Sequence, residues 1–195
     1  MKKILLPALL IFSITASAQS WISLLDKNSL AGWKVPENNI WYGVKNGVLH
    51  IQSGPDKKGS ILWTDKKFQN FKIKLQFKMG DGTVDSGVFL RGENDQIQIG
   101  ISGSLKRDMT ASPYIPKLRY PVEAKDVAKI LKPKDWNSME IEVVDKTYSV
   151  LLNNKLVMTY TSEEIPSEGP IGLQLHPGNV MSIDYKKIKV KILKS

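Results

Sequence analysis

Five polar side chains alternate with apolar residues in three short stretches of this 195-residue chain. Glutamine offers a hydrogen-bond donor and an acceptor together, and arginine offers five fixed donors, so both match the hydroxyl groups of a sugar. An ordinary exposed sheet face carries Lys, Glu and Thr instead. Taken singly, each residue could be an edge polar side chain, and His176 a structural histidine. Together they predict one polar sheet face that binds a sugar, built from Arg91, Gln96, Gln98, Gln174 and His176.

Two of these residues are candidate catalytic groups. Histidine titrates near neutral pH, so His176 is a candidate general base. Arg91 is set among the apolar residues of Ser86–Gly92 and is a candidate to stabilise a developing oxyanion. A bound divalent metal could do the same work. With only two histidines in the chain, His50 and His176, a His-rich zinc site is excluded, while a Gln/Asp/His site stays open.

The stretch from Gly103 to Pro121 interrupts the strand pattern with Pro113 and Pro116. A loop of this length inside a compact domain is usually functional or disordered, and its basic and aromatic content favours a function. Tyr114 and Tyr120 of this loop, and Trp136 further along the chain, could stack on a sugar ring. For Trp136, anchoring of a loop is the favoured interpretation. The loop adds the candidate substrate-binding residues Lys106, Arg107 and Tyr114, and Tyr120 as a further candidate stacking ring.

Period-two alternation dominates the rest of the chain. In Phe71–Met79 five apolar residues alternate with Lys and Gln, which is typical of a strand with one buried and one wet face. Asn46-Gly47 is a strong hairpin signal, and Glu123–Leu131, ended by Pro133, is the only convincing helix. The pattern predicts an all-β sandwich of two antiparallel sheets with one short helix. Its predicted strands are 22–25, 41–45, 48–52, 60–64, 71–79, 86–92, 96–99, 138–144, 170–176 and 185–193, with a hairpin at 153–154.

The first 18 residues have the form of a bacterial secretory signal. Met1-Lys2-Lys3 precedes an apolar run and the small-residue stop Ala16-Ser17-Ala18, and the run is too short for a comfortable membrane span. We expect cleavage after Ala18, one domain over residues 19–195, no membrane span after cleavage, and a periplasmic or secreted location. The chain has no cysteine, which excludes disulfides and a cysteine lipid anchor.

The formal charge of +9 does not indicate nucleic-acid binding. The lysines alternate with apolar residues, as at Lys72, Lys74 and Lys78, and therefore lie on solvated strand faces. We expect a sugar or glycoside partner and no nucleic acid.

Five motifs in order along the chain resemble the bacterial family named for 3-keto-disaccharide hydrolase. They are Leu30-Ala31-Gly32-Trp33, Asn46-Gly47-Val48-Leu49, Ser86–Gly92, Asp135-Trp136-Asn137 and Gly169–His176. The resemblance implies a concanavalin A-like jelly roll of two curved sheets with a sugar site on the concave side. It also implies cleavage of glycosides that are already oxidised to a ketone at C3.

The chain departs from the family pattern at one position. Many members carry Glu-x-Gln after the arginine strand, with another acid soon after, whereas this chain reads Gln96-Ile97-Gln98 and lacks the later acid. Asp85, Glu93 and Asp95 are candidate substitutes, and Glu93 is also a candidate substrate-binding residue. Acids in exposed loops are, however, usually only solvated.

A ketone at C3 makes the C2 proton acidic, so one base can remove it and the C1 aglycone can leave by elimination. Addition of water then gives net hydrolysis without the facing carboxylate pair of ordinary glycosidases. The expected function is therefore that of an exported enzyme acting on 3-keto-disaccharides or 3-keto-glycosides. The alternative is a non-catalytic carbohydrate-binding module with the same fold.

Overall fold

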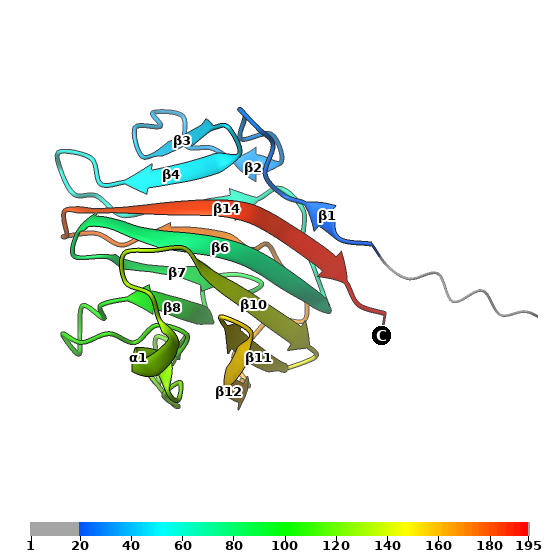
Figure 1. Cartoon of the computed structure of the whole chain (residues 1–195). Coiled ribbons are helices and arrows are strands. Elements are labelled where there is room, and N and C mark those ends of the chain that lie inside the picture. The colour runs from blue at the N-terminus through cyan, green and yellow to red at the C-terminus, as the bar shows by residue number, and fades with distance from the viewer. Residues whose placement is uncertain (1–19, 195) are drawn as a thin grey trace, which may run out of the picture.

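The computed structural model describes residues 20–194 and folds them into two stacked antiparallel sheets (Figure 1). The predicted secretory signal lies outside the described residues. The larger sheet has the order β12 (Lys155–Thr161), β11 (Thr147–Leu152), β10 (Asn137–Val144), β6 (Phe71–Gly82), β14 (Met181–Ile192), β4 (Val48–Gln52), β3 (Tyr42–Lys45), with β1 (Ile22–Ser23) paired to β14. The smaller sheet has the order β2 (Trp33–Lys34), β5 (Ser60–Thr64), β13 (Gly172–Leu175), β7 (Asp85–Phe89), β8 (Gln96–Gly100), β9 (Pro113–Tyr114). The predicted two-sheet sandwich is confirmed.

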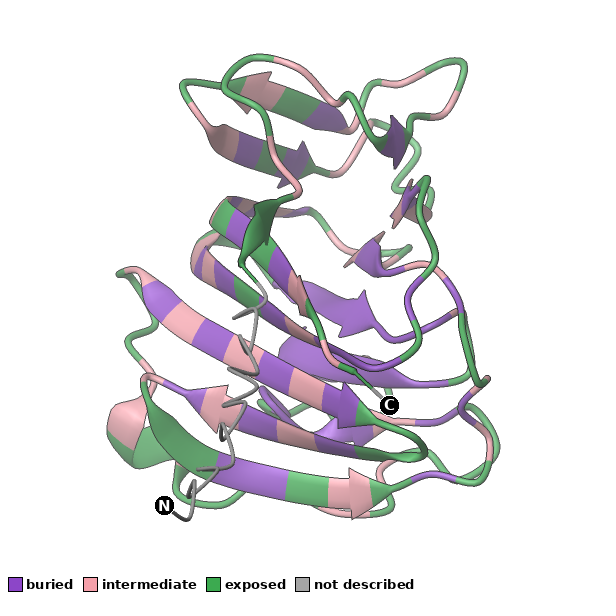
Figure 2. Cartoon of the chain, turned by 90° about the vertical axis from the view of Figure 1, so that its right-hand side faces the viewer, coloured by how far each residue is buried: buried purple, intermediate pink, exposed green. Residues whose placement is uncertain are grey.

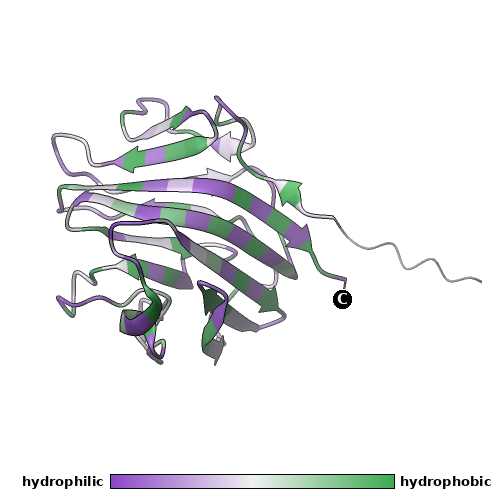
Figure 3. Cartoon of the chain, viewed as in Figure 1, coloured by the Kyte–Doolittle hydropathy of each residue, from purple (hydrophilic) through white to green (hydrophobic). Residues whose placement is uncertain are grey.

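The alternation of the sequence decides which face of each strand enters the core. Along β6, Phe71, Ile73, Leu75 and Phe77 are buried, while the lysines between them face outward. Figures 2 and 3 show the same alternation of burial and hydropathy along the long strands of the larger sheet. Because buried apolar area drives folding, this inner layer fixes the register of the two sheets.

Two predicted elements are shorter than their sequence pattern indicates. The helix α1 covers only Val127–Ile130, because Asp126 adopts a left-handed conformation (φ 56°) and Leu131 is already extended. β7 ends at Phe89, since Arg91 and Gly92 also have positive φ (60° and 131°). Such backbone interrupts the regular conformation of a helix or a strand. Among the described residues no helix is long and apolar enough to span a membrane.

A polar contact joins the two sheets beneath the outer face of β7. The hydroxyl groups of Tyr185, on β14, and Ser86, on β7, lie 2.9 Å apart, and Ser86 donates to the backbone oxygen of Gln174 at 2.6 Å. Tyr185 and Ser86 are fully buried. Because a buried hydroxyl needs its partner, this contact fixes β7 and β13 relative to the larger sheet.

The buried carboxyl group of Asp95 lies directly before β8. Its Oδ1 accepts a 2.8 Å hydrogen bond from the Tyr148 hydroxyl, whereas Oδ2 has no partner among residues 20–194. Burial raises the pKa of Asp95 above its usual value, and the hydroxyls of Ser162 and Tyr148 oppose this shift. The expectation that Asp95 is a solvated loop acid is wrong, because the side chain is fully enclosed.

We expect the stability of the protein to carry the signature of Asp95. Its carboxyl binds a proton more tightly in the folded than in the unfolded chain, so its contribution falls as pH rises from the unfolded pKa, about 3.9, through the raised folded pKa. Asp95→Asn cannot titrate, so the wild type should lose stability relative to this variant across that window. Urea unfolding at several pH values measures the difference, and parallel pH profiles would contradict the expectation.

Candidate functional site

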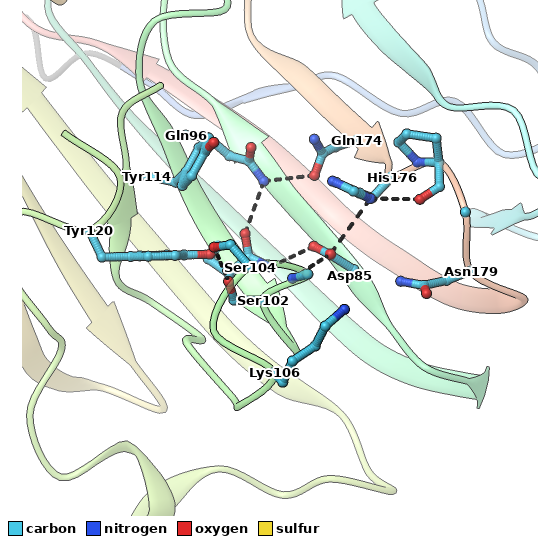
Figure 4. Close-up of a pocket in the computed structure, with 14 residues that line it drawn as sticks. Asp85, Gln96, Ser102, Ser104, Lys106, Tyr114, Tyr120, Gln174, His176 and Asn179 are labelled. Carbon is cyan, nitrogen blue, oxygen red and sulfur yellow. Dashed lines mark hydrogen bonds and ion pairs between the residues drawn. The ribbon is translucent and has the colours of Figure 1, made fainter. Parts of the chain in front are cut away.

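A cavity of about 530 Å³ lies on the outer face of the smaller sheet, where β7, β8 and β13 run side by side (Figure 4). Ile97 and Ile99 of β8 point into the core. Gln96 and Gln98, which alternate with them, therefore point outward into the cavity. The segment that follows β8, including the edge strand β9, forms another wall. The lining side chains are Asp85, Gln96, Gln98, Ser102, Ser104, Lys106, Tyr114, Tyr120, Gln174, His176, Pro177 and Asn179.

The carboxylate of Asp85, the first residue of β7, lies at the floor of this cavity and is almost fully buried. Oδ1 accepts a hydrogen bond from Gln98 Nε2 at 2.8 Å, and Oδ2 accepts one from the backbone N–H of Gly103 at 3.0 Å. The His176 Nδ1 lies 3.6 Å from Oδ2. These groups compensate the cost of burying the carboxylate.

The three glutamines form a chain of amide contacts that begins at Asp85. Gln96 Nε2 donates to Gln174 Oε1 at 2.8 Å and to the backbone oxygen of Ser86 at 3.2 Å, and lies 3.4 Å from Gln98 Oε1. Gly87 leaves the space for the Gln96 amide, since a Cβ at position 87 would lie 2.1 Å from Gln96 Nε2. The amides are therefore held in fixed orientations.

His176 follows directly after β13 and is half-exposed at the cavity wall. Its Nδ1 lies 2.8 Å from the backbone oxygen of Pro177 and 3.6 Å from Asp85 Oδ2. Both neighbours are acceptors, so the Nδ1 position carries the hydrogen and Nε2 keeps its lone pair. Figure 4 shows the Nε2 side of the ring turned toward Gln174. The arrangement is that of a base held by a carboxylate and a carbonyl.

A further wall of the cavity comes from the segment between β8 and α1, which includes the edge strand β9. The rings of Tyr114 and Tyr120 meet edge to face with centroids 5.3 Å apart. Burial raises the pKa of Tyr120 to about 12, so its hydroxyl stays protonated at neutral pH and can donate. Lys106 adds a positive charge to the lining. The wall thus combines two aromatic rings with donors.

The structure brings six of the nine predicted site residues together in this cavity: Gln96, Gln98, Lys106, Tyr114, Gln174 and His176. The other three, Arg91, Arg107 and Glu93, do not line it.

The prediction that Arg91 shares the cleft of His176 is wrong. The guanidinium is buried, and its Nε and Nη1 donate to the backbone oxygens of Gln69, Asp145 and Pro166 at 2.6, 2.6 and 3.0 Å. Nη2 donates to Asn70 Oδ1 at 3.1 Å. Burial lowers the pKa of this group, which the negative charge of Asp145 partly offsets. Arg91 therefore ties three chain segments together and belongs to the fold.

Arg107 and Glu93 also lie elsewhere. Arg107 makes a two-pronged ion pair with Glu123 at 2.5 and 2.6 Å, which fastens the loop from outside, and each partner's pKa shifts to favour its charged form because of this bond. Glu93 is exposed in the turn between β7 and β8. Arg107 thus holds the loop that carries Lys106, without facing the cavity itself.

Sequence reasoning underrated Asp85 and did not select Ser102, Ser104 or Asn179. Asp85 was named only as a candidate substitute acid, because acids in exposed loops are usually solvated. The available signal was its spacing from Gly87, since residues two apart on a strand share a face. The cavity-lining residues include one carboxylate and one histidine, and among residues 20–194 no group of three His, Asp or Glu side chains is placed to hold a metal ion. The side chains present therefore do not make a conventional three-ligand metal site.

Comparisons with known proteins agree with this architecture. A family model described as a 3-keto-alpha-glucoside-1,2-lyase-like domain matches residues 20–191. A proposed glycosyl hydrolase from Parabacteroides distasonis ATCC 8503 is similar in structure, with a TM-score of 0.67, 23% identity, and coverage of 89% of this chain and 100% of that one. No curated protein sequence matches the chain.

Two further solved structures share the fold at lower identity. The carbohydrate recognition domain of Emp47p has a TM-score of 0.58 and 15% identity, covering 92% of this chain and 99% of that one. The catalytic domain of an endo-1,3-beta-glucanase from Thermotoga petrophila RKU-1 has a TM-score of 0.56 and 14% identity, covering 91% and 100%. The predicted concanavalin A-like fold is confirmed.

We expect Arg91→Lys to weaken folding and to leave sugar binding by the folded protein unchanged. Lysine cannot reach four acceptors from one nitrogen, so the variant should lose about 2–4 kcal/mol of unfolding free energy. Denaturant unfolding measures this loss, with Arg107→Lys as the control at an exposed ion pair. If Arg91→Lys kept the stability of the wild type but lost its affinity for sugar, Arg91 would instead belong to the sugar-binding site.

Proposed function

Since the chain belongs to the family of 3-keto-alpha-glucoside-1,2-lyase-like domains, we propose that it cleaves glycosides whose C3 hydroxyl has been oxidised to a ketone. The observation that carries this proposal is the pairing of His176 with Asp85 in a cavity lined by amides. A glycoside activated by a ketone needs one base, and the cavity offers one. We further propose that the enzyme is exported and meets its substrate in the periplasm or outside the cell.

The reaction begins with proton transfer from C2 of the sugar to Nε2 of His176. The electron pair of the C–H bond forms the enolate of the C3 ketone, and it then forms the C1–C2 double bond as the C1–O bond breaks. The aglycone oxygen takes the electrons of the C1–O bond and accepts the proton from Nε2 of His176. Addition of water to the double bond would give net hydrolysis.

The side chains of the cavity divide this work between them. The backbone oxygen of Pro177 accepts the Nδ1 hydrogen of His176, and the carboxylate of Asp85, 3.6 Å from Nδ1, stabilises the imidazolium that forms in the first step. Lys106 carries the positive charge of the lining and offsets the negative charge that develops on the sugar. The edge-to-face pair of Tyr114 and Tyr120 offers an apolar surface for a sugar ring.

A second candidate function is that of a carbohydrate-binding module. One observation favours it: the only carboxylate in the lining, Asp85, is held by three neighbours and so offers little to a sugar. A binding module needs the amides and the aromatic wall but no free base. The two candidates therefore differ in what His176 does.

The deciding experiment offers purified protein a 3-keto disaccharide and its unoxidised parent, with and without chelator. We expect cleavage of the keto sugar alone and a loss of about 100-fold or more in His176→Asn, since general-base catalysis contributes about 10²–10⁴. His50→Asn is the matched control, because His50 pairs with Asp184 on the larger sheet. Sugar binding without cleavage of either sugar would favour the binding module.

A further inference from the structure

The direction of the three glutamine amides in the cavity follows from the carboxylate of Asp85 and the backbone oxygen of Ser86. An ionised carboxylate only accepts hydrogen bonds, so Gln98 must turn its NH₂ group toward Oδ1. Gln98 then presents Oε1 to Gln96, and the NH₂ group of Gln96 faces this oxygen. The same NH₂ group meets Gln174 Oε1. The buried carboxylate of Asp85 and the backbone oxygen of Ser86 thus set the polarity of three amides together.

This polarity leaves two amide atoms free for a ligand at the end of the row of glutamine side chains. Gln96 Oε1 accepts no hydrogen bond and Gln174 Nε2 donates none within residues 20–194. Figure 4 shows this oxygen and this nitrogen turned to the same side of the two contacting amides. The cavity therefore presents one acceptor beside one donor.

We propose that this pair recognises the ketone of the substrate together with a neighbouring hydroxyl group, an inference that rests on the proposed function. Gln174 Nε2 donates to the keto oxygen, which can only accept. Gln96 Oε1 accepts from the adjacent hydroxyl group. Gln174 and Gln96 are thereby the residues that distinguish an oxidised sugar from its parent.

The count of protons explains the discrimination. A ketone next to a hydroxyl group carries one acceptor and one proton, which match the donor of Gln174 and the acceptor of Gln96. Two neighbouring hydroxyl groups carry two protons for the single acceptor, so one proton is left without a partner on binding. An unpaired polar hydrogen in an enclosed site weakens binding, since its hydration is lost without replacement.

The same argument accounts for glutamine at position 96. A glutamate there would place carboxylate oxygens against Gln98 Oε1 and the backbone oxygen of Ser86, neither of which can donate, and only Gln174 could turn its NH₂ group toward it. Gln98 cannot reverse its amide because Asp85 requires its NH₂ group. Asp85 and Gln96 are therefore chemically matched in this chain.

The test measures binding rather than turnover, by titration calorimetry of a 3-keto disaccharide and its parent with the His176→Asn protein. We expect tighter binding of the keto sugar, and a decrease of about tenfold in that preference when Gln174→Glu is added, because an acceptor then faces the ketone. Gln174→Leu, which removes the donor without adding charge, should lower the preference by a smaller factor. Gln76→Glu, on the outer face of the larger sheet, is the matched control and should leave it unchanged.

Each result bears on a different claim. A keto preference that survives Gln174→Glu overturns the assignment of Gln174, and cleavage of the keto sugar by the wild type would then still support the proposed function. If the wild type neither cleaves the keto sugar nor prefers it in binding, both proposals are overturned. Thermal unfolding of each variant confirms that the comparison is made on folded protein.

Discussion

The buried carboxylate of Asp85 is the constraint on which the cavity depends. Its oxygens accept hydrogen bonds from the Gln98 amide and from the backbone N–H of Gly103, and His176 lies beside them. These contacts draw a strand, a loop and the end of a second strand toward one point. Because a buried carboxylate is costly without such partners, the cavity is ordered before any ligand arrives. Preorganised dipoles are what a charge-separating reaction requires.

The strand that carries Asp85 is fixed at both ends by unlike interactions. Near its start, Ser86 reaches Tyr185 of the opposite sheet, and beyond its end, Arg91 gathers carbonyl oxygens from three separate segments. Gly87 between them admits the Gln96 amide across the strand. A single short strand therefore supports the core on one face and the cavity on the other.

Local alternation was sufficient to predict the sandwich and most of the cavity face. Gln96, Gln98, Gln174 and His176 share a face because residues two apart on a strand do so, and the sequence shows that spacing directly. The role of Arg91 could not be predicted, since its backbone turns to positive φ and its partners come from distant segments. The start of the short helix was predicted too early for a related reason, the left-handed conformation of Asp126.

The glutamine at position 96 has a meaning in the structure that it lacks in the sequence. Many members of the family carry a glutamate at this position. Compared with them, Gln96 replaces an acid, which weakens the case for catalysis. Beside Asp85 and Gln98 it is the residue whose hydrogen-bond donors fit the oxygens around it. A second carboxylate there would add like charge to an enclosed site that already holds one. In the proposed reaction, proton transfer therefore falls to His176, and position 96 serves to orient the substrate.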